Sequence, residues 1–244
     1  ERKKRIFVIG GGPAGMEAAR VAALRGHEVT LYEKSDKVGG QMRLGAKTPL
    51  LPEWPDVVKY FGTQLKKTGV KVELRKEATA KLINKERPDA LILATGARPT
   101  IPAVTGIEKP IAASLFDVLE EKVAVGSRVV VWGGREMGVQ TAEWLASRGK
   151  EVTIIEEGKR IGRDINIFNT MPHRRKLAEL GIKQLTNVKV ERIIDNGIVV
   201  TVEGKEQTIE ADTIVLATGM EADKELLEEL GGTAEVEEIH SIGD

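Results

Sequence analysis

Short runs of apolar residues alternate with longer amphipathic stretches along this chain, and one such series opens the sequence. Residues 5–9 are mostly β-branched or aromatic and predict a strand, and a glycine-rich turn follows at residues 10–15. Residues 16–24 are rich in alanine and predict a helix, which ends before Gly26. Residues 27–33 predict a second strand with an acid at its end. The segment is therefore expected to form a strand–helix–strand unit of a parallel sheet.

The same pattern returns later in the chain. Residues 128–132 predict a strand, residues 133–138 a glycine-containing turn, and the residues that follow, through Ser147, a helix. A register without gaps over separate motifs indicates that a whole nucleotide-binding domain has been duplicated. The constant distance between equivalent positions is 123 residues (133 − 10 for the first glycines), and it relates Gly10 to Gly133, Gly15 to Gly138, Glu33 to Glu156, and the Ala-Thr-Gly sequence at 94–96 to that at 217–219.

We therefore predict an α/β fold with two tandem Rossmann-like, three-layer domains, the second inserted into the first. Prolines and glycines at residues 98–110 break regular structure and mark the crossover between the copies. With these bounds, residues 1–110 and 221–244 form the first domain and residues 111–220 form the second. An alternative interpretation places the same prolines in a surface loop within one domain.

The first glycine turn has the spacing that a bound dinucleotide requires. A helix start offers unpaired amide N–H groups and the positive end of the helix dipole, and both attract a pyrophosphate. Gly10 permits the tight turn, Gly12 lets the backbone approach the phosphates, and Gly15 lets the helix pack closely on the strand. Glu33, at the end of the second strand, is placed to accept hydrogen bonds from ribose hydroxyls.

Composition excludes several other classes of function. The chain has 37 Lys and Arg against 37 Asp and Glu, and this balance gives no reason to expect a nucleic-acid partner. No apolar run approaches the ~20 residues of a membrane-spanning helix, so we predict a cytoplasmic protein without a membrane partner. Cysteine is absent, which excludes a redox-active disulfide and cysteine ligands for an iron–sulfur cluster within these residues. We predict no metal site.

Several short sequences of this chain together resemble the flavin-dependent pyridine-nucleotide oxidoreductases. The broad resemblance is carried by residues 10–15, 33–35 and 38–41, both Ala-Thr-Gly sequences and residues 242–244. Residues 39–42, 54–65 and 160–164 carry a narrower resemblance to the C-terminal half of the 2,4-dienoyl-CoA reductase, trimethylamine dehydrogenase and enoate reductase group. The resemblance implies an FAD site in the first domain, formed by Gly10, Gly12, Pro13, Ala14, Gly15, Glu33, Lys34, Gly40, Gln41, Ala94, Thr95, Gly96 and Asp244.

The second domain is then expected to bind the nicotinamide dinucleotide that reduces the flavin. Its one departure is Arg135, which stands where the first copy has Gly12 (135 − 12 = 123). The guanidinium either pairs with phosphate or fills the cleft and weakens binding. Glu156 favours NADH over NADPH because a carboxylate repels a 2′-phosphate, although Lys159 and Arg160 offset this repulsion. The predicted site comprises Gly133, Gly134, Arg135, Met137, Gly138, Glu156 and Gly219.

Because hydride transfer is chemistry of the cofactors, we expect no catalytic side chain in this chain. Its three histidines have no evident acid partner in the sequence and are expected to be structural, with His27 and His173 at the surface. In the group that it resembles, an N-terminal barrel carries FMN and a 4Fe–4S cluster and reduces the substrate. That barrel is missing here, and the family's pattern continues beyond Asp244, so the resemblance implies a truncated piece of a longer enzyme.

Three functions remain open at this stage. The first is an electron-input module, in which NAD(P)H reduces FAD and electrons pass to the barrel for reduction of an enoyl or enoate substrate. The second is a free-standing NADH:acceptor reductase that uses a quinone, a dye or oxygen. The third is a dinucleotide-binding domain without turnover, in which Arg135 has closed the second site.

Overall fold

The chain was analysed as a computed structural model, which describes residues 2–48, 52–231 and 236–243. It divides into two compact units, of which the first is discontinuous in sequence. Each unit has its own five-stranded parallel sheet, which confirms the predicted α/β class with Rossmann-like domains. Unit 1 contains Glu1–Ala46, Pro52–Arg98 and Glu221–Asp244, and unit 2 contains Lys47–Leu51 and Pro99–Met220.

The sheet of unit 1 has the strand order β15-β4-β1-β2-β3, and all four neighbouring pairs are parallel. The strand that the sequence predicts at the start of the chain is its central strand, because β1 pairs with both β2 and β4. Its strands are β1 (Arg5–Ile9), β2 (Glu28–Glu33), β3 (Lys71–Leu74), β4 (Ala90–Leu93) and β15 (Glu238–Ser241). Its helices are α1 (Pro13–Leu24), α2 (Met42–Gly45), α3 (Trp54–Lys67), α4 (Ala80–Glu86) and α8 (Glu225–Leu230).

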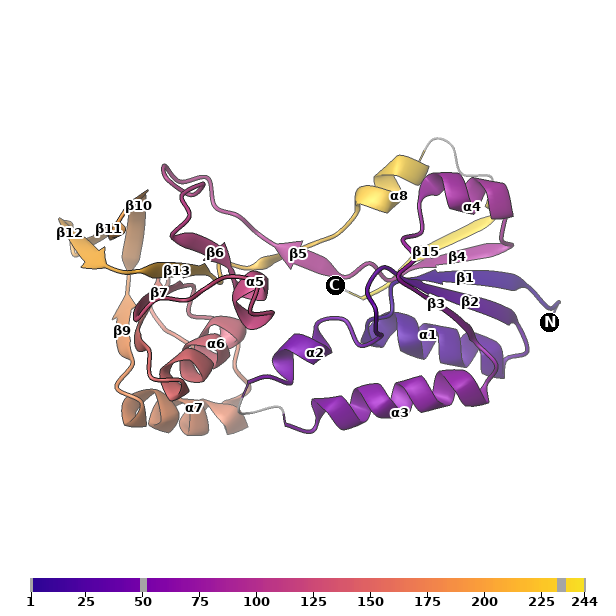
Figure 1. Cartoon of the computed structure of the whole chain (residues 1–244), viewed down its shortest axis with the longest axis horizontal. Helices are drawn as coiled ribbons and strands as arrows, with labels where there is room; N and C mark the ends of the chain where they lie inside the picture. Colours follow the sequence, from indigo (N-terminus) through magenta and orange to yellow (C-terminus); the bar gives the residue numbers. More distant parts are fainter. Residues whose placement is uncertain (1, 49–51, 232–235, 244) are drawn as a thin grey trace. The chain divides into compact units, whose positions relative to one another are not determined.

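Unit 1 has three layers because the side chains of its strands alternate between two apolar cores. Val8 lies in the core that is closed by Met16 of α1 and Leu65 of α3. Phe7, the neighbouring residue, lies in the opposite core with Ile83 of α4. Figure 1 shows α1 and α3 on one face of this sheet and α4 with α8 on the other.

The sheet of unit 2 has the order β6-β13-β7-β8-β9 and is also parallel. A separate antiparallel sheet with the order β10-β11-β12 is inserted in the sequence between β9 and β13. The parallel strands are β6 (Ala112–Ser114), β7 (Arg128–Trp132), β8 (Glu151–Glu156), β9 (Lys183–Thr186) and β13 (Thr213–Leu216). The antiparallel strands are β10 (Val188–Ile194), β11 (Gly197–Val202) and β12 (Lys205–Glu210). The helices are α5 (Leu115–Leu119), α6 (Glu136–Ser147) and α7 (Ile167–Glu179).

Unit 2 also has three layers, but one of them is a sheet instead of a layer of helices. Trp132 and Ile155 of the parallel sheet pack against Ile198 of the antiparallel sheet in one continuous core. On the other face, α6 packs against β7, β8 and α7, and it buries Val139 and Leu145 there. One layer that is helical in unit 1 is therefore a small sheet in unit 2.

Residues that flank two further short strands make contacts that repeat the 123-residue offset. The Thr95 hydroxyl donates to the carbonyl of Asp223 at 2.7 Å, and the Thr218 hydroxyl donates to the carbonyl of Thr100 at 2.8 Å. Positions 95 and 218 are equivalent by the offset, and so are positions 100 and 223. The threonine of each copy therefore donates to the equivalent carbonyl of the other copy. These contacts support the duplication that the sequence predicts. The two strands pair with each other and are β5 (Ala97–Pro99) and β14 (Met220–Ala222).

Residues 99–110, which the sequence analysis assigns to the first domain, group instead with unit 2. Val104 and Ile107 pack against the core between its two sheets, and Thr105 forms a β-bridge to Arg192 of β10. The segment after the prolines therefore packs two partly buried apolar side chains on unit 2. The division between units therefore lies near residue 98.

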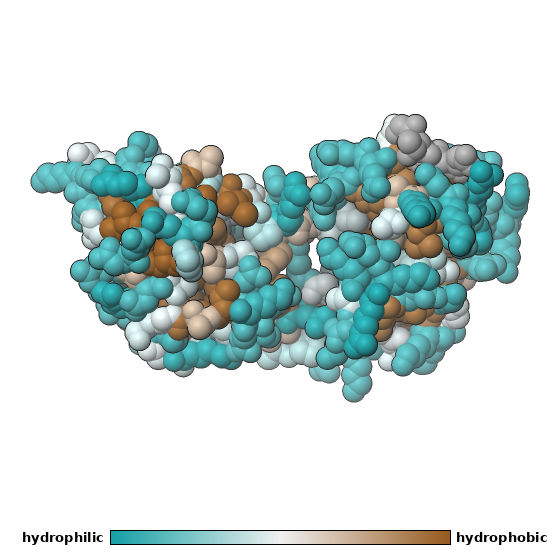
Figure 2. All heavy atoms as spheres, turned by 45° about the horizontal axis from the view of Figure 1, so that its top comes forward, coloured by the Kyte–Doolittle hydropathy of each residue, from teal (hydrophilic) through white to brown (hydrophobic). Residues whose placement is uncertain are grey.

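Charged and polar residues cover much of the face in view in Figure 2. The described residues include no helix that combines the length and apolar character needed to cross a membrane. Ile167, Phe168 and Met171, at the start of α7, are the most exposed large apolar side chains among those described.

Candidate functional site

The first glycine turn joins β1 to α1 at a point where three backbone segments meet. Gly10 has a φ of +106°, and a Cβ atom there would lie 2.2 Å from the carbonyl oxygen of Ala94. A Cβ atom at Gly15 would lie 1.9 Å from the carbonyl oxygen of Gly10. No side chain fits at either position, since both contacts are with backbone. These two glycines are therefore required for the close packing of β1, α1 and β4.

Gly12 differs from its two partners because nothing lies within 4 Å of a Cβ atom built on it. It is the N-cap residue of α1, with extended backbone, and Pro13 supplies the first helical residue. The helix start thus faces open space, while the glycine leaves the backbone uncovered. This arrangement fits a pyrophosphate at the positive end of the helix.

Glu33, at the end of β2, holds the glycine turn in place. Its Oε2 accepts a hydrogen bond from the Gly11 N–H at 2.7 Å, and its Oε1 accepts one from the Ser35 N–H at 2.7 Å. The side chain is 9% exposed. Each carboxylate oxygen has a second lone pair, so the group has acceptor capacity left for ribose hydroxyls beside the turn. Lys34, the next residue, is exposed.

The other residues that the resemblance implies for FAD lie around the same turn. A Cβ atom on Gly40 would lie 3.0 Å from the Cα atom of Gly12, and the Gln41 side-chain amide donates to the Ala97 carbonyl at 3.0 Å. Thr95 and Gly96 directly follow Ala94, and Gly96 has a φ of +74°. Gly243 lies against Ala14, because a Cβ atom on Gly243 would be 3.2 Å from that of Ala14. Asp244 lies outside the described residues.

The second glycine turn repeats this geometry in unit 2. A Cβ atom on Gly133 would lie 2.1 Å from the Ala217 carbonyl oxygen, and one on Gly138 would lie 2.0 Å from the Gly133 carbonyl oxygen. Glu156 accepts hydrogen bonds from Gly134 N–H at 2.7 Å and from Gly158 N–H at 2.8 Å. These two hydrogen bonds are equivalent to those that Glu33 accepts from Gly11 and Ser35. The glycines and the acid that the sequence predicts for the second site are therefore also brought together at this turn. Gly219 has a φ of +129°.

The two turns differ at three side chains, of which Arg135 in place of Gly12 concerns the glycine pattern, and at one hydrogen bond. Arg135 has φ −74° and ψ 173°, close to the values of Gly12, φ −71° and ψ 179°. Its exposed side chain therefore costs no backbone strain. The N–H of Glu136, the first residue of α6, donates to Oδ1 of Asp164 at 3.0 Å. Met137, which follows, is half-buried. A carboxylate thus already caps the second helix.

One expectation about the histidines is wrong. His173 is buried, with 2% exposure, and its Nδ1 lies 2.8 Å from Oε1 of Glu143, which has 0% exposure. The two residues lie on α7 and α6, 30 positions apart, so only the packing of these helices brings them together. The sequence held one signal for this pair: Glu143 stands in the middle of an otherwise apolar helix face, and an acid that becomes buried is usually paired.

Residues 4–239 match the pyridine nucleotide-disulphide oxidoreductase family. The chain belongs to this family. It is 38% identical over 222 residues to an NADH oxidase from Thermoanaerobacter brockii, a match that covers 89% of this chain and 34% of the relative. It is 35% identical over 236 residues to a cinnamate reductase from Clostridium sporogenes, covering 94% of this chain and 35% of the relative.

A solved structure of 2-naphthoyl-CoA reductase in complex with 2-naphthoyl-CoA superposes on the whole chain with a TM-score of 0.96. The two share 48% sequence identity, and the match covers 100% of this chain and 37% of that one. These similarities confirm the predicted superfamily and the narrower likeness to enoate and dienoyl-CoA reductases. The chain spans about a third of the length of these relatives.

Family membership and the two glycine turns identify a flavin-dependent NAD(P)H oxidoreductase module. The disulfide chemistry in the family's name does not apply to these residues, since the sequence has no cysteine. Electrons that enter this chain must therefore leave it by a route other than a cysteine pair of its own.

Proposed function

We propose that this chain is the electron-input module of a longer reductase. NAD(P)H binds to unit 2 and FAD to unit 1, and the electrons pass to a partner domain that carries FMN and a 4Fe–4S cluster and reduces an enoyl or enoate-type substrate. The observation that carries this proposal is the presence of two glycine turns with the same backbone geometry in a chain that matches only about a third of a cinnamate reductase and of a 2-naphthoyl-CoA reductase.

The residues of unit 1 would hold FAD by backbone contact and one carboxylate. The amides at the start of α1 bind the pyrophosphate, and Gly12 leaves them accessible. Glu33 orients the adenosine ribose while it also fixes the turn through Gly11. When bound, FAD supplies the chemistry that accepts a hydride and releases electrons singly, and the protein's part is to hold it in position.

Unit 2 would place the nicotinamide dinucleotide by the same contacts, with Glu156 at the ribose. Arg135 stands beside the expected phosphates and has two possible effects there, pairing with them or occupying their space. The carboxylate of Asp164 at the first amide of α6 adds to the second effect, because it competes with phosphate for that amide. We expect binding of the nicotinamide dinucleotide that is weaker than binding of FAD.

The test uses the purified chain, reconstituted with FAD under anaerobic conditions. The proposal predicts a yellow protein whose flavin absorbance NADH or NADPH bleaches, and which has no activity on an enoate by itself. Steady oxidation of NADH with a dye or a quinone, at a rate that a supplied barrel domain does not increase, would favour a free-standing reductase. That alternative has support from the similarity to an NADH oxidase.

A second outcome would point to a domain without turnover. Tight FAD binding without any bleaching by NADH or NADPH is expected if Arg135 and Asp164 close the second site. Protein that stays colourless after reconstitution with FAD would contradict both the input module and the domain without turnover. Only the assignment of the fold would then stand.

A further inference from the structure

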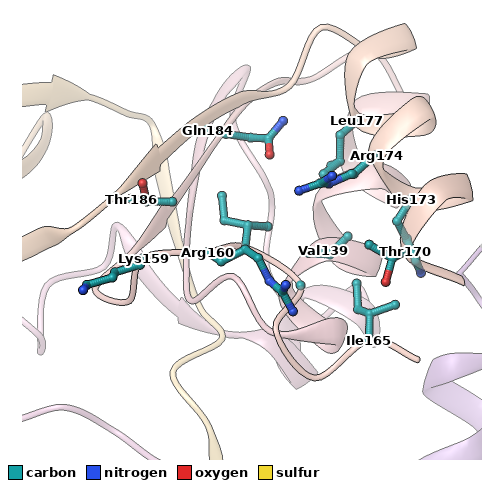
Figure 3. A pocket seen from close by; sticks show the side chains of 12 residues that line it. Val139, Lys159, Arg160, Ile165, Thr170, His173, Arg174, Leu177, Gln184 and Thr186 are labelled. Carbon is teal, nitrogen blue, oxygen red and sulfur yellow. The ribbon is translucent and has the colours of Figure 1, made fainter. Parts of the chain in front are cut away.

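Helix α7 packs on the rest of unit 2 through one narrow side. His173 and Leu177, four positions apart, are its buried residues. The same side lines a cavity of about 180 Å³ together with α6, β9 and the loop after β8, and Figure 3 shows Thr170 and Leu177 beside this cavity. The cavity has a cationic lining, supplied by Lys159, Arg160 and Arg174. The fold of unit 2 therefore uses only this side of α7.

The opposite side of α7 carries apolar side chains that none of the described residues covers. Ile167, Phe168 and Met171 are 79%, 86% and 68% exposed. Arg175 and Ala178, which are also exposed, continue the same side of the helix. Positions 168, 171, 175 and 178 alternate spacings of three and four residues, the spacing along which two helices pack against each other. These five residues are called the outer face of α7 below.

The outer face is large enough to be a contact surface. Its three apolar side chains expose on the order of 400 Å², and an apolar patch of that size on a soluble protein commonly marks contact with another molecule. A helix whose apolar residues serve only its own core carries them on the inward side. The spacing and the exposure together indicate that a second helix covers the outer face.

A hollow beside Phe168 indicates which helix fits. The hollow has a volume of about 670 Å³ and lies along α7 itself, lined by Met171, Pro172, Arg175, Lys176 and Glu179. Phe168 projects from α7 directly before it. When two copies of α7 lie antiparallel around a two-fold axis, Phe168 of each copy meets the hollow of the other. The sulfur of Met171 and the guanidinium of Arg175 both attract aromatic rings, which suits the hollow to this side chain.

The charges at the two ends of α7 fit the same arrangement. Arg163 and Glu179 are exposed and stand at equal distances from Met171 (171 − 163 = 8 and 179 − 171 = 8). With Met171 at the two-fold axis, Arg163 of each copy lies beside Glu179 of the other. The two Arg175 residues are then eight positions apart along the pair of helices, or about 12 Å, which exceeds the Debye length of ~8 Å at physiological salt. Attraction at the ends therefore outweighs repulsion between like charges.

We infer that the outer face of α7 pairs antiparallel with the outer face of a second copy of this chain, with Met171 at the two-fold axis. The apolar area is about half of the ~800 Å² that each partner contributes to a standard interface, so the dimer is weak, with a dissociation constant on the order of 10–100 µM. The inference goes beyond the proposed function, because it requires neither the flavin nor the nicotinamide dinucleotide.

The first experiment measures sedimentation of the unmodified chain over a concentration range that spans this dissociation constant. The expected result is a reversible equilibrium between monomer and dimer. Phe168→Lys should weaken association tenfold or more, because it places a cation against an apolar surface. Leu24→Lys is the matched control, since Leu24 is an apolar residue of α1 in unit 1 with 62% exposure. It should change the dissociation constant less than about twofold.

A charge exchange tests the antiparallel direction. Arg163→Glu and Glu179→Arg should each weaken association about threefold to tenfold at low ionic strength, because each places like charges together at both ends of the pair. The double variant restores opposite charges and should return the dissociation constant to within about twofold of the unmodified value. A double variant that associates more weakly than either single variant would contradict the antiparallel arrangement.

Cysteine cross-linking tests the position of the axis, because the chain has no cysteine of its own. Met171→Cys should form a disulfide-linked dimer with oxidised glutathione, since the two Cα atoms beside the axis lie within the ~7 Å that a disulfide spans. Glu179→Cys should not, because its two copies lie sixteen positions apart along the helices, or about 24 Å. Cross-linking of Met171→Cys that is no faster than that of Leu24→Cys would overturn the inference.

A chain that stays monomeric at every concentration would also overturn it, and would point to the rest of a longer protein as the cover of the outer face. All of these measurements use the chain without FAD. A failure to bind FAD or to react with NADH would leave their outcome unchanged, so the dimer and the proposed function fail separately.

Discussion

The two glycine turns have the same backbone but different requirements for their glycines. Gly10 and Gly133 would each place a Cβ atom within about 2.2 Å of a backbone oxygen, so both copies require glycine for packing. At the middle position the first copy has Gly12 and the second has Arg135, with nearly identical dihedral angles. Nothing within 4 Å restricts that position in the first copy. The outer glycines are therefore needed for the fold, whereas the fold does not require a glycine at the middle position.

A second difference lies at the residues that face the two helix starts. Gln41 and Asp164 are equivalent by the offset (164 − 41 = 123). Gln41 donates to the Ala97 carbonyl, while Asp164 accepts from the first amide of α6. At the start of α1, the equivalent of Glu136 is Pro13, which has no N–H to donate. The comparison teaches that duplication kept the turn and changed the charge around it.

The largest effect is expected from the packing glycines. Gly10→Ala should abolish FAD binding and destabilise the protein by more than about 2 kcal/mol, because the new methyl group overlaps the Ala94 carbonyl at a positive φ. Gly133→Ala should abolish binding of the nicotinamide dinucleotide and destabilise unit 2 in the same way. The protein should stay yellow, because the FAD site in unit 1 is unchanged. Flavin absorbance and urea unfolding measure both effects.

The control is Gly62→Ala in α3, where nothing lies within 4 Å of the added Cβ atom. A methyl group there should raise stability by about 1 kcal/mol through helix propensity. A Gly10→Ala protein that keeps its flavin would contradict the steric argument.

An exchange at the middle position comes next. Gly12→Arg should weaken FAD binding at least about tenfold and change stability by less than about 0.5 kcal/mol, since the side chain enters open space. Arg135→Gly, the reverse change, should strengthen NADH binding several-fold if the guanidinium fills the cleft. Calorimetric titration of each variant measures the two affinities. Equal or poorer NADH affinity in Arg135→Gly would count against a guanidinium that fills the cleft, and only poorer affinity would indicate that it pairs with phosphate.

The smallest effect concerns two equivalent acids, directly before β4 and β13, that bind the first residues of β1 and β7. Asp89 accepts the Arg5 N–H at 2.6 Å, and Asp212 accepts the Arg128 N–H at 2.8 Å. Only Asp212 also binds its arginine's guanidinium, at 2.8 Å and 3.2 Å, because the Arg5 guanidinium donates to a backbone carbonyl instead. The side-chain hydrogen bonds from Arg128 lower the pKa of Asp212 from 3.8 to about 2.

A lowered carboxyl pKa stabilises the folded state above the unfolded pKa, and that contribution is lost as the pH falls through the folded pKa. Asp212→Asn should therefore lower the urea midpoint slightly at pH 6, and the difference from the unmodified protein should shrink as the pH falls from the unfolded pKa of 3.8 toward about 2 and disappear only below that. Asp89→Asn serves as the control for loss of a carboxylate–amide bond alone. A difference between Asp212→Asn and the unmodified protein that does not depend on pH would exclude the proposed cause.

The repeated elements followed from the sequence to within a few residues. The first predicted strand is β1 at Arg5–Ile9, and the predicted helix 16–24 is α1, which begins earlier at Pro13 because proline is favoured in a first turn. The glycines and acids of both turns were found for the same reason, since their spacing is fixed by local backbone geometry. The antiparallel sheet of unit 2 was not predicted, because its strands are stabilised by pairing and by a shared core rather than by any local signal.

The sequence by itself determined the fold class, the duplication and the two glycine turns, because glycine positions and apolar alternation are local properties of the chain. Only the tertiary structure decided where residues 99–110 belong and that His173 is buried against Glu143. It also decided that Asp164 caps α6 and that a cationic cavity lies beside α7. These features join residues that are far apart in sequence, and their free energy depends on burial and on partners that no local pattern specifies.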